Sequence, residues 1–326
     1  MAFRFGCGLV YLGVVLAFVS VAAVACGGSS SSIGGGVSTD QATTDAANAY
    51  CNRAQACAPA YVTLGYGDVA TCASRYKQTL VTSFGATGSV ETADQIEACA
   101  QAIPNTTCAD LLGRNPPSQC QTVPGTLADG AACGSDSQCT GTVCHVPANA
   151  VCGTCGEPVV AGSACVDDDD CTYGLSCVNA TCVAYGAENA TCDDGHPCRP
   201  DLGCKSGTCT APSPVGTACQ SSNECDNLHG TFCDPTTMQC VNVSFAAPSA
   251  ACGIVGSQLV ACTGPGSLCG GDTAPPYEGT CVDYAADGAV CDTANGPLCD
   301  VGAVCVPSSP AATAGTCTLQ DPASCK

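Results

Sequence analysis

Several residues beyond position 150 have types and spacing that could do chemistry. Cys152-Gly-Thr-Cys155 has the spacing of a redox dithiol. Redox catalysis needs such a pair at the N-terminus of a helix within a βαβ unit. This pair lies instead in a stretch rich in Gly and Pro. We therefore expect both cysteines to be structural.

Four consecutive carboxylates, Asp167 to Asp170, lie between Cys165 and Cys171. Carboxylates in a short constrained loop could hold Ca²⁺ weakly, but the alternating ligand spacing of a calcium loop is missing. We expect a solvated acidic loop and no metal site.

Lys205 lies in the short loop between Cys204 and Cys209. Protease inhibitors often present a basic side chain on a loop braced by disulfides, so the alternative function is an inhibitor of extracellular serine proteases that presents Lys205. Arg199 suits that role poorly because Pro200 follows it. A single Lys in one loop is thin support for this alternative.

The three histidines, His145, His196 and His229, have no zinc-finger spacing, and we expect each to have a surface role. The sequence contains no recognisable Ser/His/Asp set and no phosphate-binding loop. We therefore expect no catalytic residue, no metal, no cofactor and no enzymatic activity.

Composition indicates the compartment. The chain has 34 Cys among 326 residues, a density typical of a disulfide scaffold in an oxidising, extracytoplasmic environment. It has 8 Lys+Arg and 28 Asp+Glu. No basic stripe is present, which argues against a nucleic-acid partner.

Residues 1–25 are expected to be an export signal: Arg4 precedes an apolar stretch that ends in small residues. The cut would fall directly before Cys26, and a Gly/Ser-rich tether follows it up to residue 37. Lipid on Cys26 would also leave an even number of cysteines for pairing. We expect a lipid anchor in a bacterial membrane, and Gly27 favours the outer one. Plain secretion is the alternative.

Residues 38–123 have helical patterns. Ser38, Asp68 and Thr92 are each placed to cap a helix, and a short helix over residues 107–112 should end at a glycine. The first two of the six cysteines here would point about 120° apart on a helix, so they should bond to two different helices. The pairing is otherwise open among Cys51, Cys57, Cys72, Cys99, Cys108 and Cys120.

From residue 124 to residue 326 the helical pattern disappears, and Gly, Pro, Asp, Ser and Thr separate the cysteines. These cysteines form a repeated unit of four, which often opens on a Gly-small-small-Cys turn. Cys325 and either Cys152 or Cys155 are left over. We number the six units 1 to 6; they begin at Cys133, Cys165, Cys192, Cys219, Cys252 and Cys291.

Units 2 and 3 have the spacing Cys-x5-Cys-x5-Cys-x4-Cys with the sequences GLSC, DLGC and GTC. They resemble the Dickkopf N-terminal cysteine-rich module. The whole layout resembles the cysteine-rich envelope lipoproteins of myxobacterial type, including a hinge, Gly125-Thr-Leu-Ala-Asp-Gly130, before the modules. The resemblance implies an architecture and an envelope location. It implies no activity, because a cysteine frame does not determine function.

Each unit is too short to fold on a hydrophobic core, so disulfides must supply its stability. We expect the first cysteine to bond to the third and the second to the fourth, as in many small cysteine ladders, because interlocked bridges make a compact knot. The longer loops of units 5 and 6 leave their pairing open. The expected pairs in units 2, 3 and 4 are Cys165–Cys177 and Cys171–Cys182, Cys192–Cys204 and Cys198–Cys209, and Cys219–Cys233 and Cys225–Cys240.

The expected fold is small and disulfide-rich: a stapled helical domain followed by an elongated array of short hairpins, in which each unit contacts chiefly its neighbours. The expected function is that of a non-enzymatic, surface-anchored lipoprotein with a structural or protein-interaction role. It would meet the membrane through its lipid and bind an unidentified protein partner. A secreted eukaryotic signalling or matrix protein is a further alternative.

Overall fold

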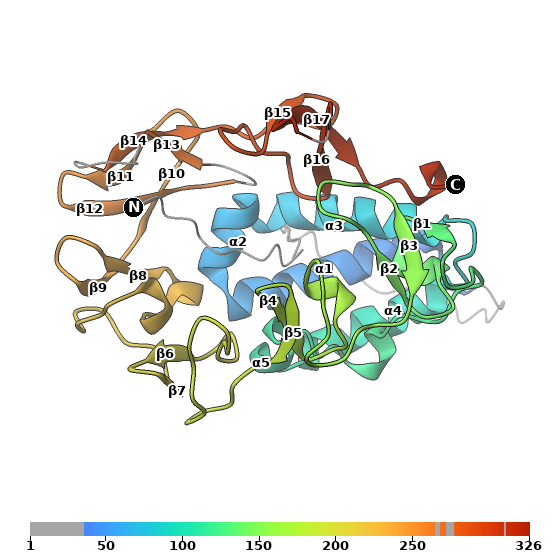
Figure 1. Ribbon diagram of the computed structural model, residues 1–326, viewed down its shortest axis with the longest axis horizontal. Coiled ribbons are helices and arrows are strands. Elements are labelled where there is room, and N and C mark those ends of the chain that lie inside the picture. The colour runs from blue at the N-terminus through green and yellow to red at the C-terminus, as the bar shows by residue number, and fades with distance from the viewer. Residues whose placement is uncertain (1–35, 265–267, 272–276, 310) are drawn as a thin grey trace, which may run out of the picture.

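The structure is a computed structural model that describes residues 36–264, 268–271, 277–309 and 311–326. The expected export signal and the lipidation site Cys26 lie outside the described residues. Helices come first in the chain and short strands in small sheets follow, as the sequence predicts (Figure 1).

The helical domain contains three longer helices, which pack together, and two shorter ones. The longest, α1, contacts both α3 and α4. A thin core of small residues fills the space between them; Ala47, Ala54 and Val62 are among its fully buried members. The helices are α1 (Thr39–Cys57), α2 (Pro59–Tyr66), α3 (Val69–Phe84), α4 (Ala93–Ala102) and α5 (Cys108–Leu112).

The caps explain where these helices begin. The Ser38 hydroxyl accepts a hydrogen bond from the backbone N–H of Gln41 at 3.2 Å, and Asp68 caps α3 in the same manner. Thr92 forms a capping box at the start of α4. Each of these caps satisfies a backbone N–H that has no partner within its helix. The sequence patterns predict all three caps, but they do not predict α2.

Three disulfides hold this domain together: Cys51–Cys72, Cys57–Cys108 and Cys99–Cys120. The first joins α1 to α3 and the second joins α1 to α5. The two cysteines at the end of α1 therefore bond to different helices, as their angular separation indicated.

The array consists of short antiparallel hairpins, one or more in each unit. Unit 5 is the largest and adds one parallel strand pair, β10 with β12. The strands are β1 (Ala132–Cys133), β2 (Val143–His145), β3 (Gly153–Gly156), β4 (Leu175–Val178), β5 (Thr181–Ala184), β6 (Gly203–Lys205), β7 (Thr208–Thr210), β8 (Thr231–Asp234), β9 (Gln239–Asn242), β10 (Ser244–Ala246), β11 (Ala251–Val255), β12 (Gln258–Cys262), β13 (Leu268–Gly270), β14 (Glu278–Val282), β15 (Val290–Asp292), β16 (Ala303–Pro307) and β17 (Ala314–Leu319).

All six units share one internal construction. The third and fourth cysteines lie directly opposite each other across a hairpin, as Cys177 and Cys182 do in unit 2. The residue three positions before the first cysteine has a positive φ, and its N–H donates to the carbonyl of the fourth cysteine. This turn favours Gly, which explains the Gly-small-small-Cys pattern. The six turn residues are Gly130, Gly162, Asn189, Gly216, Ser249 and Gly288.

The disulfides follow the same order in every unit, first to third and second to fourth. Units 2, 3 and 4 contain the pairs expected from the sequence. Units 5 and 6 keep this order despite their longer loops, and unit 1 uses Cys155 as its fourth cysteine. The two leftover cysteines, Cys152 and Cys325, bond to each other. Every cysteine from Cys51 to Cys325 is thus paired.

The expectation of an elongated array is wrong. In Figure 1 the units follow one another around the helical domain, so that unit 6 and the C-terminus return to unit 1. The Cys152–Cys325 bridge closes this circuit. The array curves because its units contact the helical domain as well as each other: Leu228 of unit 4 packs against the buried Ala58 and Leu112, and Val301 of unit 6 packs against the domain core.

Polar contacts add to this packing. Arg75 of α3 reaches unit 6, where its guanidinium donates to both carboxylate oxygens of Asp287 at 2.7 and 2.9 Å and to the carbonyl of Val301 at 2.6 Å. At the other end of the array, the amide of Gln138 in unit 1 donates to the carbonyl of Thr87 at 2.7 Å. The array is therefore fixed to the helical domain at both of its ends.

The density of disulfides indicates an oxidising, extracytoplasmic environment. Among the described residues, no helix has both the length and the apolar character that a membrane span requires.

Candidate functional site

A cavity of about 270 Å³ lies between the helical domain and unit 2 and is the strongest candidate for a binding site. Three tyrosines line it: Tyr50 from α1, Tyr76 from α3 and Tyr173 from unit 2. Two carboxylates, Glu91 and Asp169, and a set of apolar residues share the lining. An apolar, aromatic cavity with a few polar groups has the character of a small-molecule site.

The disulfide framework positions two of the tyrosines. Tyr50 immediately precedes Cys51, and Tyr76 follows Cys72 by one helical turn. The Cys51–Cys72 bridge therefore draws the two rings together, and they stack with their centroids 4.7 Å apart and their planes 21° apart. Burial is the main cause that raises the pKa of Tyr76 to about 12, and the charge of Glu91 adds to this. Burial raises the pKa of Tyr50 as well, so both hydroxyls stay neutral at physiological pH.

Arg114 lines the cavity and contacts unit 2. Its guanidinium binds an Asp169 carboxylate oxygen at 2.6 Å and also donates to the backbone carbonyl of Asp168. The backbone carbonyl of Arg114 accepts from the N–H of Gly174 at 3.0 Å. The adjacent Tyr173 hydroxyl accepts from the backbone N–H of Thr122 at 3.1 Å. These bonds fix the Tyr173 loop of unit 2 against the end of the helical domain.

Glu91 is a half-buried carboxylate just before α4. Burial is the main cause that raises its pKa, while a hydrogen bond from the Ser137 hydroxyl acts in the opposite direction. Within the described part of the chain, no Lys, Arg or His forms an ion pair with it. Since Asp169 is neutralised by Arg114, the lining has a net charge of one negative unit, located at Glu91.

The expectation of a solvated acidic loop at Asp167 to Asp170 is wrong for two of its residues. Asp168 and Asp170 are buried. Asp168 accepts from the N–H of Cys177 at 2.6 Å, and Asp170 accepts from the N–H of Val166 at 2.6 Å. These carboxylates therefore accept hydrogen bonds from the backbone of their own unit.

Units 1 and 4 use the same two positions. Asp136 of unit 1 and Ser222 of unit 4 accept from the N–H of their third cysteine, as Asp168 does. Gln138 and Glu224 correspond in the same way to Asp170. In these units, the polar side chains between the first and second cysteines thus accept hydrogen bonds from the backbone of their own unit.

His145 lies at the end of β2, and its surroundings differ from the surface role expected for it. Its Nδ1 is 2.6 Å from a carboxylate oxygen of the buried Asp170, and its Nε2 is 3.1 Å from the carbonyl of Glu157. Both partners are acceptors when Asp170 is ionised, so both bonds form together only when the ring is the doubly protonated imidazolium. The ring therefore joins unit 1 to unit 2. His196 and His229 each pair with a nearby aspartate at an exposed site.

The structure places Lys205 in a hairpin of unit 3. It lies in β6, paired with Thr208 across a two-residue turn, and its Nζ is 3.4 Å from the Ser213 hydroxyl.

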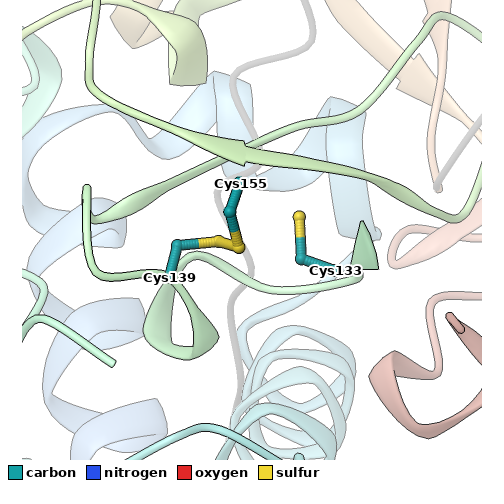
Figure 2. Close-up of side chains that lie close together, drawn as sticks. All are labelled: Cys133, Cys139 and Cys155. Carbon is teal, nitrogen blue, oxygen red and sulfur yellow. A yellow bond between two sulfur atoms is a disulfide. The ribbon is translucent and has the colours of Figure 1, made fainter. Parts of the chain in front are cut away.

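The cysteine sulfurs gather in groups of three inside the units. Figure 2 shows Cys133 beside the bonded pair Cys139 and Cys155. Cys133 is itself bonded to Cys144. Zinc and iron–sulfur centres require thiolates, so these groups offer no metal ligand while the bridges are intact. Cys152 and Cys155, which have redox spacing, belong to two different bridges.

Comparison of the chain with protein-family models, with curated proteins and with solved structures finds no match.

Proposed function

We propose that this chain is a bacterial envelope lipoprotein, anchored through lipid on Cys26, whose folded part is a non-enzymatic binding protein. The pairing of cysteines supports the anchor: each cysteine from Cys51 to Cys325 is bonded to another in that range. No partner therefore remains there for Cys26, whose position after small residues suits lipidation. Several acyl chains on this residue would hold the protein stably, whereas a single chain would not.

The curved array favours a binding role over a spacer role. A spacer must extend away from the membrane, whereas here the array returns to its starting point and is closed by Cys152–Cys325. The result is a closed arrangement with a lined cavity between the helical domain and unit 2. This cavity is the observation that carries the binding proposal, because walls already braced by disulfides need less ordering when a ligand binds.

Two measurements test the proposal. Mass spectrometry of the mature N-terminus from the native host should show a diacylglyceryl group on Cys26, and an unmodified Cys26 would contradict the anchor. The oxidised mature protein, immobilised and exposed to envelope fractions, should retain a specific partner or ligand, and the reduced, alkylated protein should not. Equal retention by both forms would contradict a role for the folded body.

A further inference from the structure

The cavity between α1, α3 and unit 2 has one charged group that the protein itself leaves without an opposite charge. Glu91 is half-buried beside Tyr76 and has no cationic partner among the described residues. Arg114, the cation in the same lining, is already held by Asp169 at 2.6 Å. The hydrogen bond from the Ser137 hydroxyl to Glu91 brings no positive charge, so a cation within reach would stabilise this partly buried carboxylate further. A ligand that complements this cavity therefore carries a positive charge.

Gln95, Gln119 and Gln121 also line the cavity, but most of the remaining lining is apolar and favours an apolar body on that ligand. The stacked rings of Tyr50 and Tyr76, together with Leu80 and Ile96, form the wall from the helical domain. Aromatic faces attract cations as well as apolar groups, which makes a cationic, aromatic ligand the best match. An anionic ligand is disfavoured because Glu91 would repel it.

The volume limits the ligand to a small molecule. A cavity of about 270 Å³ lies below the usual size of a pocket for a drug-sized ligand, so the ligand must be small. The formal charge of the whole chain, −20, raises the local concentration of cations near the surface and assists their entry.

We propose that this cavity binds a small aromatic amine, with its ring against Tyr50 and Tyr76 and its ammonium group on the Glu91 carboxylate. This inference rests on the proposed binding function and specifies the ligand class. The ammonium donates to the carboxylate, and the bond is strong because both groups are charged and partly removed from water.

Isothermal titration with phenethylamine, which has nine non-hydrogen atoms, tests the proposal on the oxidised mature protein. We expect saturable binding at one site. Phenylacetate has the same ring and the opposite charge, and ethylamine has the ammonium group without the ring. Each should bind at least tenfold more weakly. In NMR spectra the ring resonances of Tyr50 and Tyr76 should shift with phenethylamine alone.

Glu91→Gln keeps the shape of the side chain and removes its charge, so it should weaken phenethylamine binding at least tenfold. Glu188→Gln, at an exposed position away from the cavity, is the matched control and should leave binding unchanged. Circular dichroism and thiol titration verify that both variants fold and keep their bridges. Equal binding by Glu91→Gln, or tighter binding of phenylacetate, would overturn the proposal.

Absence of phenethylamine binding to the intact protein would also overturn this inference. It would leave the proposed function standing if the oxidised protein still retains a partner from envelope fractions. Failure of both experiments would remove the proposed function as well, so the two are separable.

Discussion

Cys152 and Cys325 are 173 residues apart in the sequence, and a disulfide joins them with their Cα atoms 5.4 Å apart. This bridge is the covalent link between the first and last parts of the array. The other array disulfides lie within single units and span at most 19 residues. The closed shape of the array therefore depends on this bridge together with the contacts to the helical domain.

Removal of the closing bridge should loosen the C-terminal part while each unit keeps its own fold. In the double variant Cys152→Ser/Cys325→Ser we expect the free energy of unfolding to fall by at most about 5 kcal/mol, the chain-entropy value for a loop of this length, because the internal bridges shorten the effective loop. Hydrogen exchange should increase first in residues 314–326. Unchanged exchange there would show that the bridge does not restrain unit 6.

Arg75 should contribute more to stability than its neighbour on the same helix. Its partners Asp287 and Asp300 have side chains exposed by 31% and 13%, so Arg75→Met leaves a largely buried carboxylate without its cation. We expect a loss of roughly 2 kcal/mol in the free energy of unfolding, between the values for surface and buried pairs.

Lys77→Met is the matched control for Arg75→Met. Lys77 pairs with Asp40, whose side chain is 83% exposed, and its replacement should change stability by less than about 1 kcal/mol. Denaturant unfolding of both variants with the disulfides intact gives the comparison. Equal losses in the free energy of unfolding would indicate that the contact of Arg75 with unit 6 stabilises the protein no more than the exposed pair of Lys77 and Asp40 does.

We expect Asp168 to stabilise unit 2 mainly by accepting a hydrogen bond from the backbone, and less through its negative charge. Asp168→Ala leaves the N–H of Cys177 without its partner and should cost about 1–3 kcal/mol. Asp168→Asn keeps an oxygen in the same place and should retain much of that stability. If both variants lose the same amount in chemical denaturation, the negative charge matters more than the hydrogen bond.

Asp136 should make stability depend on pH. Burial is the main cause that raises its pKa to about 7, against the opposing effect of the Cys144 N–H. The ordinary pKa of an unfolded Asp is about 3.9. The folded state therefore binds the Asp136 proton more tightly than the unfolded state does. This proton contributes up to about 4 kcal/mol to the free energy of unfolding; the contribution is fully present below about pH 4 and is lost as the pH rises to about 7.

Asp136→Asn should remove this contribution. The free energy of unfolding of the variant, measured from pH 4 to pH 8, should fall less steeply with rising pH than that of the unmodified protein. Parallel curves for the two proteins would mean that Asp136 titrates at its ordinary value in the folded state.

Local features of this fold follow from local sequence. The caps at Ser38, Asp68 and Thr92 and the turn at Gly162 each depend on residues within a few positions of one another, and such patterns are visible in a sequence. The order of the bridges within a unit is also local, since each spans at most 19 residues.

The arrangement of the array could not be predicted in the same way. It depends on contacts between distant residues, such as Arg75 with Asp287 and Cys152 with Cys325, and neither contact has a local signature. The sequence offered one signal for the closed array: two cysteines remain after the six units have taken four each, and Cys325 is one of them. These two could bond to each other. The cavity was missed for the same reason, because Tyr76 and Tyr173 come together only when unit 2 packs against the helical domain.

The most direct test of the closed array is the identity of the partner of Cys325. Proteolysis of the oxidised, unreduced protein, followed by mass spectrometry with fragmentation that cleaves disulfides, assigns that partner. The structure predicts a linked pair of peptides in which Cys325 is bonded to Cys152, with Cys155 bonded to Cys139. A Cys152–Cys155 bond, or Cys325 as a free thiol, would contradict the closed array.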